Sequence, residues 1–200
     1  MSVKHIIIEG LPATGKSEVS NFLKIYFPDN FYYFPELTTE IVRKHKLNIL
    51  VDRNKLTDAF AEEICVRQND IENKKKEFES KGVKNAVIFE ESHIGVHWSY
   101  SKHLNDEYFL NKYPQIKDKL VFPDFFIRLL IPFELSCKRQ IARNTPDVEV
   151  SAEIIKQMYE YLLEWHKSNH NKKVYIIDAD KSPDKVLRKV MKTLDLKYDR

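Results

Sequence analysis

An eight-residue stretch near the start of the sequence has the pattern of a phosphate-binding loop. It reads Gly10-Leu11-Pro12-Ala13-Thr14-Gly15-Lys16-Ser17, which fits the spacing G-x-x-x-x-G-K-S. The two glycines let the backbone turn tightly and approach an anion, so that successive N–H groups point at phosphate oxygens. Lys16 adds a mobile positive charge, and the Ser17 hydroxyl is an oxygen of the kind that binds magnesium. The loop predicts a nucleoside triphosphate with Mg²⁺, contacted by Gly10, Ala13, Thr14, Gly15, Lys16 and Ser17, with Ser17 on the metal.

Carboxylates follow two apolar segments beyond this loop. Glu36 comes after the segment 31–34 and is a candidate base. The equal alternative is a carboxylate in the first turn of a helix, where the helix dipole favours a negative charge. Glu90 and Glu91 come after the segment 86–89, where P-loop enzymes keep the acid that orients magnesium. We expect Glu90 to orient the magnesium; a plain turn at the strand end is the alternative for this residue. We also expect Glu36, Glu90 and Glu91 to face the acceptor of the phosphoryl group.

Three arginines are candidates for binding transferring phosphates. Arg67 lies on the apolar stripe of a helix expected over residues 56–78, so it is either a clamp for a substrate phosphate, which we favour, or half of a buried ion pair. Arg139 and Arg143 lie one turn apart in a later helix and precede a turn at 144–147. This pattern predicts a lid over about 139–152, with a solvated basic face as the alternative.

The elements that must position these residues alternate along the chain. Short apolar runs, separated by helical patterns, occur at 5–8, 31–34, 86–89, 125–131 and 174–177. This alternation predicts an α/β protein with three layers, in which a mostly parallel sheet is covered by helices on both faces. In such a sheet ligands bind beyond the carboxyl ends of the strands, where the candidates above are expected to lie.

Aromatic side chains are concentrated between residues 98 and 124. Some are expected to wall a slot for a nucleobase, and core packing is the alternative for each. The set is Trp98, Tyr100, Tyr108, Phe109 and Tyr113.

Composition excludes several classes of protein. Two hundred residues predict one domain, and a net charge of +3 without a basic tail gives no reason to expect nucleic acid. Cys65 and Cys137 show neither a disulfide framework nor metal spacing, and His93 and His97 lack a third zinc ligand. No apolar run reaches the length of a signal or a membrane span, so a cytoplasmic protein is expected, without a membrane partner.

The motifs together resemble the thymidylate kinase and deoxynucleoside kinase superfamily over nearly the whole chain. Ile8-Glu9-Gly10 resembles the family's opening, and Asp178-Ala179 resembles the turn after its last strand, which would border the adenine. The resemblance implies a P-loop fold with a five-stranded parallel sheet, ATP and Mg²⁺ as cofactors, and phosphorylation of a nucleoside or nucleotide at its 5′ end. By position, the resemblance implies that Lys16 binds the phosphates and that Arg67 faces the acceptor. It also implies that Arg139 and Arg143 belong to the lid and that Glu36 is the family's carboxylate after the second strand.

The sequence departs from the family pattern at three places. After the second strand the family usually has glutamate before proline, whereas here Pro35 comes before Glu36. Glu91 stands where the family typically has arginine after the third-strand acid, and an anion there would favour a neutral acceptor. Ala61 stands where nucleoside kinases often have a glutamine that contacts the base.

The leading hypothesis is a kinase of a nucleoside or nucleoside monophosphate; the alternatives are a kinase of another small metabolite and an ATP-binding regulatory module without transfer. A GTPase is not expected, because no guanine-binding Asn-Lys-x-Asp motif follows. The oligomeric state stays open, with a homodimer as one alternative.

Overall fold

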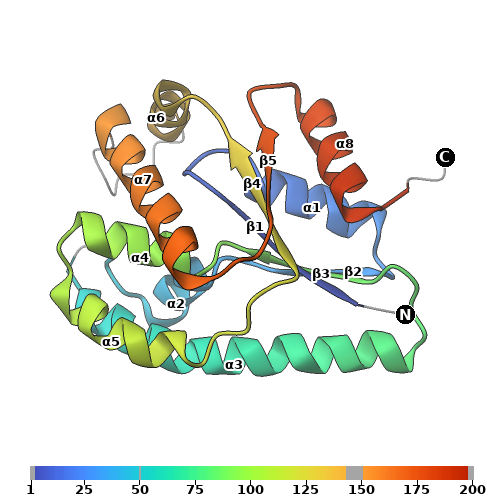
Figure 1. Ribbon diagram of the computed structural model, residues 1–200, viewed down its shortest axis with the longest axis horizontal. Coiled ribbons are helices and arrows are strands. Elements are labelled where there is room, and N and C mark those ends of the chain that lie inside the picture. The colour runs from blue at the N-terminus through green and yellow to red at the C-terminus, as the bar shows by residue number, and fades with distance from the viewer. Residues whose placement is uncertain (1–2, 50, 143–150, 198–200) are drawn as a thin grey trace.

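The computed structural model describes residues 3–49, 51–142 and 151–197. Its centre is a five-stranded sheet in the order β2-β3-β1-β4-β5, and every neighbouring pair is parallel (Figure 1). The strands are β1 (Lys4–Gly10), β2 (Phe31–Phe34), β3 (Val87–Glu91), β4 (Phe125–Leu130) and β5 (Val174–Asp178). The predicted α/β sheet with helices around it is confirmed, and each expected apolar run forms a strand.

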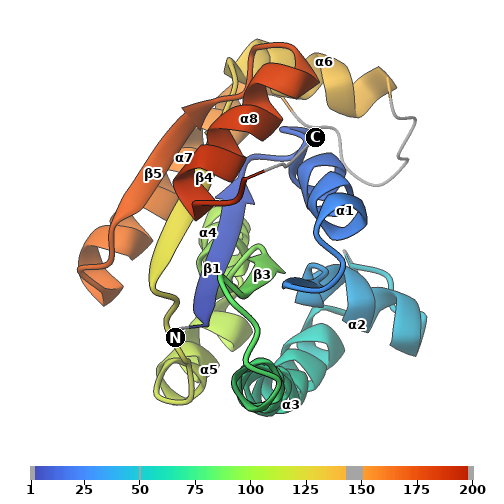
Figure 2. The ribbon, with the colours of Figure 1, turned by 90° about the vertical axis from the view of Figure 1, so that its right-hand side faces the viewer.

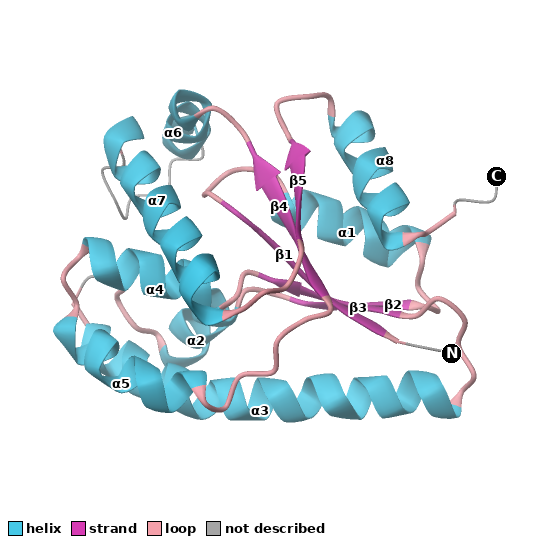
Figure 3. Ribbon diagram, in the orientation of Figure 1, coloured by secondary structure: helices cyan, strands magenta, loops and turns pink. Residues whose placement is uncertain are grey.

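Helices cover both faces of the sheet, as Figure 3 shows by colour. The first group, α1 (Lys16–Tyr26) and α8 (Pro183–Leu194), packs on one face. Figure 2 shows α3 and α5 side by side at the end of the molecule away from α6. The other helices are α2 (Leu37–His45), α3 (Arg53–Ser80), α4 (Ile94–His103), α5 (Glu107–Lys117), α6 (Phe133–Ala142) and α7 (Ala152–Asn169).

Side-chain alternation along the strands divides the core into two layers. In β1, Ile6 and Ile8 join the cluster beneath α1 and α8, whereas Ile7 joins the cluster formed with α2, α3, α4, α5 and α7. Successive residues of a strand point to opposite faces, so a continuous apolar run supplies both layers at once. The same alternation decides which face each polar residue at a strand end can reach.

Several elements extend beyond their expected bounds, and one extension alters the site. Strand β3 continues to Glu91 instead of ending at Phe89, because its register with β1 continues to the pair Ile8 and Glu91. Glu90 and Glu91 therefore project from opposite faces of the sheet instead of sharing a loop. Helix α3 is also longer than expected, but its buried stripe includes Arg67 as predicted.

The Ser151 side chain accepts a hydrogen bond from the Ile154 backbone N–H and so caps α7. Among the helices of the described residues, none combines the length and the apolarity needed to cross a membrane.

Candidate active site

The loop between β1 and α1 has the geometry of a phosphate cradle. Gly10 has φ +151°, and a Cβ there would lie 2.5 Å from the Leu129 carbonyl oxygen, so no larger residue fits. Gly15 has φ +94° and directly precedes α1, whose first N–H groups are available to an anion. The Lys16 ammonium donates to the carbonyl oxygens of Gly10 (3.1 Å) and Leu11 (3.2 Å), across the same loop. The loop therefore gathers backbone donors and one cation at the carboxyl end of the central strand.

Glu91 lies directly beside this loop. The Ser17 hydroxyl donates to Oε1 of Glu91 at 2.9 Å, and the Tyr33 hydroxyl donates to Oε2. Glu91 is on the α1 face of β3, as its alternation requires, and its exposed fraction is 6%. A serine hydroxyl next to a carboxylate is a set of hard oxygen donors that suits Mg²⁺ better than zinc. The part of the chain that is described holds no group of three His, Cys, Asp or Glu side chains fit for a metal, so phosphate oxygens and water would supply the other ligands.

Glu90 lies on the opposite face, in a buried network with Arg67. Its carboxylate contacts His5 Nε2 at 3.2 Å and Arg67 Nη1 at 3.4 Å. Arg67 also donates to the Pro35 carbonyl oxygen at 3.0 Å and pairs with Glu40. Burial alone would raise the pKa of Glu90, but the hydrogen bond to His5 and the nearby cations hold it below the ordinary value. Glu90 is therefore an ionised carboxylate that balances Arg67.

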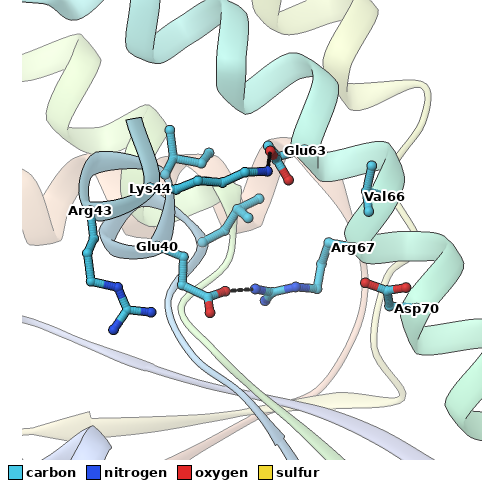
Figure 4. Close-up of a pocket in the computed structure, with 9 residues that line it drawn as sticks. Glu40, Arg43, Lys44, Glu63, Val66, Arg67 and Asp70 are labelled. Carbon is cyan, nitrogen blue, oxygen red and sulfur yellow. Dashed lines mark hydrogen bonds and ion pairs between the residues drawn. The ribbon is translucent and has the colours of Figure 1, made fainter. Parts of the chain in front are cut away.

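Figure 4 shows the outer side of this network, a hollow of about 500 Å³ between α2 and α3. Glu40 and Arg67 point toward each other across it, and Lys44 pairs with Glu63 nearby. Arg67 thus occupies the wall between this hollow and Glu90, and its charge is shared by two carboxylates. Of the alternatives for Arg67, the buried ion pair is present; the clamp stays a prediction.

A larger cavity, of about 820 Å³, opens beside Glu36 and Glu90. Glu36 is the N-cap residue directly before α2, and its carboxylate accepts a hydrogen bond from the Thr39 hydroxyl at 3.0 Å. Burial raises the pKa of Glu36, Lys16 lowers it and Glu91 raises it further, with a net increase. Its coupling to Lys16 places the Glu36 carboxylate at the phosphate end of the cavity. The wall includes residues from α2, α3, α4 and α7, among them Thr38, Phe60, His97, Tyr100 and Met158.

The aromatic residues of 98–124 take three kinds of position: one lines the cavity, three pack in or against the core and one lies on the surface. Tyr100 lines the cavity. Phe109 and Tyr113 are buried in the core on the α3 face, where Tyr113 accepts a hydrogen bond from Trp165 at 2.6 Å. Tyr108 bonds to Asp58 on the surface of α3. A flat wall is instead formed by Phe60 and His97, whose rings stack with centroids 4.9 Å apart.

The predicted lid and adenine residues are only partly described. Arg139 Nη1 donates to the Ala13 carbonyl oxygen at 3.4 Å, which brings α6 onto the phosphate loop. Arg143 lies outside the described residues, as does most of the expected lid. Asp178 ends β5 and accepts a hydrogen bond from the Asp180 N–H, and the Ala179 N–H donates to Leu130. The roles expected of these residues stay predictions.

Sequence reasoning missed a buried charge cluster behind the loop. Glu9 in β1 lies opposite Arg128 in β4; its Oε1 accepts from Arg128 Nε at 2.7 Å, and Oε2 lies 2.9 Å from His166 Nε2. Burial raises the pKa of Glu9, but the His166 and Arg128 contacts outweigh that effect and lower it. Charged residues inside two apolar strands were the available signal, because buried charges require partners.

Comparison with known proteins agrees with this geometry. A model of the deoxynucleoside kinase family matches residues 6–195. The chain belongs to the deoxynucleoside kinase family. It is a P-loop nucleoside kinase, a phosphotransferase whose substrates are nucleotides and nucleosides. A comparison with curated proteins gave no significant match.

The fold of this kinase is also found in solved structures. Two are of deoxyadenosine kinase from M. mycoides, one with the products dCMP and a flexible dCDP and one with dCTP bound. Their TM-scores are 0.69 and 0.66, at 16% and 15% identity, over 96% of this chain and 98% of each of those chains. Likeness at this level of identity establishes the shared fold.

Proposed function

We propose that this kinase transfers the γ-phosphoryl group of ATP to the 5′-hydroxyl of a nucleoside. The acceptor oxygen forms a bond to the γ-phosphorus, the bond from that phosphorus to the β,γ-bridging oxygen breaks, and ADP leaves. The proton of the acceptor hydroxyl passes to Glu36. Catalysis of this kind is mainly positioning and charge neutralisation, which the loop amides and Lys16 are suited to provide.

The observation that carries this proposal is the pairing of Arg67. A monophosphate acceptor brings about two negative charges and needs unpaired cations. Arg67 is instead engaged by Glu40, Glu90 and a backbone carbonyl, while Glu36 adds a third carboxylate to the same region. This balance supports a neutral hydroxyl over a phosphate as the acceptor.

For the metal, we propose Glu91 in place of Glu90. Ser17 and Glu91 are hydrogen-bonded to each other at the loop, whereas Glu90 is committed to His5 and Arg67. Mg²⁺ bound with ATP would neutralise charge on the phosphate oxygens. If Glu91 is the third-strand acid, the position where the family typically has arginine is the next residue, Ser92. The departure from the family pattern then lies at Ser92 and not at Glu91.

We also propose roles for the lid arginines and for the residues that follow β5. Arg139 already contacts the loop, which supports a role for Arg139 and Arg143 in covering the phosphates. Asp178 and Ala179 are proposed to border the adenine, and Phe60 with His97 offers a flat surface for the acceptor base. A cytoplasmic location is proposed, which fits Cys65 and Cys137 not forming a disulfide; a homodimer is left to direct measurement.

A product assay tests the proposal. The four common deoxynucleosides and their 5′-monophosphates are each incubated with ATP and Mg²⁺, and phosphorylated products are identified by mass spectrometry. We expect nucleoside 5′-monophosphates from at least one nucleoside and no diphosphates. Products from monophosphates alone would contradict the assignment of the acceptor, and no product from any acceptor would contradict transfer itself.

The variant Lys16→Ala tests the phosphate loop in the same assay. Within the described residues, its ammonium donates hydrogen bonds to two carbonyls of the loop, so the fold should survive, while loss of the charge should abolish turnover. Circular dichroism provides the folding control. Turnover retained at the original rate would contradict the assignment of the loop.

A further inference from the structure

Tyr33 is a polar side chain at the site that neither the family pattern nor the sequence assigned a role. It lies in β2 and is half-buried, with its ring packed against the core beneath α1. Its hydroxyl donates to Oε2 of Glu91. The hydroxyl is not needed to fill the core, so this polar contact calls for a separate explanation.

The two oxygens of Glu91 have donors from different elements. Oε1 receives the hydrogen of Ser17 from α1, at 2.9 Å, and Oε2 receives that of Tyr33 from β2. A hydroxyl that gives its hydrogen to a carboxylate keeps its lone pairs available for a metal ion. Tyr33 therefore limits rotation of the carboxylate, and the carboxylate in turn directs the hydrogen of Ser17.

The surroundings of Tyr33 favour the protonated phenol that donates to Glu91. Burial, followed by the hydrogen bond to Glu91, raises the pKa of the Tyr33 phenol far above its ordinary value, and the charge of Glu36 raises it further.

We propose that Tyr33 is a positioning residue for the magnesium of the bound nucleotide, acting through Glu91. The inference rests on the proposed function, because it assumes that ATP and Mg²⁺ bind at the phosphate loop. Partners that orient a metal-binding carboxylate typically change metal affinity by about 10–100-fold when they are removed. We expect an effect near the lower end of this range, because Ser17 still holds the other oxygen.

Calorimetry with Tyr33→Phe measures this effect directly. The substitution keeps the ring and removes one oxygen, and ATP is titrated once with excess Mg²⁺ and once with EDTA. We expect the affinity for ATP with Mg²⁺ to fall roughly tenfold, while the affinity for metal-free ATP is unchanged. A matched control is Tyr32→Phe, because Tyr32 is the adjacent residue, is 37% exposed and packs against Phe34 on the other face of the sheet.

Each outcome separates this inference from the proposed function. An equal loss with and without Mg²⁺, or no loss, would overturn the role of Tyr33 while leaving ATP binding in place. Wild-type protein that binds no ATP under either condition would overturn both. If Tyr33→Phe is unfolded at the temperature of the assay, Glu91→Gln and Glu91→Gln/Tyr33→Phe are compared instead at a lower temperature at which circular dichroism shows both to be folded. Because Tyr33 acts through Glu91, the second replacement should add no further loss of Mg²⁺-dependent affinity, and an additional tenfold loss would contradict the proposal.

Discussion

Among single residues, Glu36 is the one whose surroundings give its chemistry a pH dependence. A general base acts only when it is ionised, and burial raises the pKa of Glu36 above the ordinary 4.5 despite the opposing charge of Lys16. We therefore expect kcat/KM for a nucleoside to fall as the pH drops through this raised pKa. Glu36→Gln should lower kcat by about 10²–10⁴ and remove this acidic limb. A pH profile with the same limb in the variant would exclude Glu36 as its source.

The two glutamates of β3 show how far single residues could be predicted. Their place after an apolar run predicted the carboxyl end of β3, which is where both residues lie. Which one reaches the loop depends on whether the strand ends before or after them, since alternation exchanges their faces. An apolar run gives no sign that the β1 ladder continues past it, so Glu90 was expected on the metal and Glu91 was found beside Ser17. Tyr33 gave no signal at all, because an aromatic residue in a strand is ordinarily core.

At the scale of elements, the pair Glu9 and Arg128 joins two neighbouring strands, and His166 joins both to α7. Removing one partner leaves a buried charge uncompensated, which typically costs about 3–5 kcal/mol. We expect Arg128→Leu to lower the free energy of unfolding by about that amount, measured by urea denaturation. The matched control is Arg188→Leu, because Arg188 pairs with Asp184 on the exposed side of α8 and should change stability by under about 1 kcal/mol.

The same pair has a predictable dependence on pH. The pKa of Glu9 is held below its ordinary 4.5 in the folded state, so its contribution to stability is complete above that value and is lost as pH falls through the lower folded pKa.

In Glu9→Gln/Arg128→Leu neither charge remains, so the loss of unfolding free energy should be smaller than that of Arg128→Leu alone. Equal costs for the single and double variants would show that the charges are not coupled.

The contact between α4 and α7 depends on one small residue. A Cβ on Gly95 would lie 2.4 Å from the Trp165 ring, which is buried and anchored by its hydrogen bond to Tyr113. Alanine gains about 1 kcal/mol in helix propensity over glycine, but overpacking costs about 1–3 kcal/mol. We expect Gly95→Ala to destabilise the protein in urea, and Trp165→Phe to relieve part of that cost in the double variant. A stabilised Gly95→Ala would mean that the two helices can separate without loss.

For the whole molecule, the sequence was sufficient for the architecture because alternating strands and helices constrain a parallel sheet strongly. The contents of the cavity were less predictable, since its wall combines α2, α3, α4 and α7, which are far apart along the chain. Apolar periodicity finds each helix, but it carries no information on which polar residue faces which helix. The pairing of Arg67 with Glu40 and Glu90 is such a case, because its partners lie 27 and 23 residues away.

Ligand binding at one end of the sheet should stabilise the whole chain if it unfolds as one domain. ATP with Mg²⁺ at about 100 times its Kd adds about 2.7 kcal/mol to the folded state, which corresponds to a rise in Tm of roughly 5–10 °C for a chain of this length. Circular dichroism follows all helices, whereas tryptophan fluorescence follows Trp98 in α4 and Trp165 in α7. In the wild type, ATP with Mg²⁺ should raise the Tm measured by both probes by the same amount. In Lys16→Ala the ligand should leave both Tm values unchanged. Separate transitions would instead show that the α4 and α7 side unfolds independently of the phosphate loop.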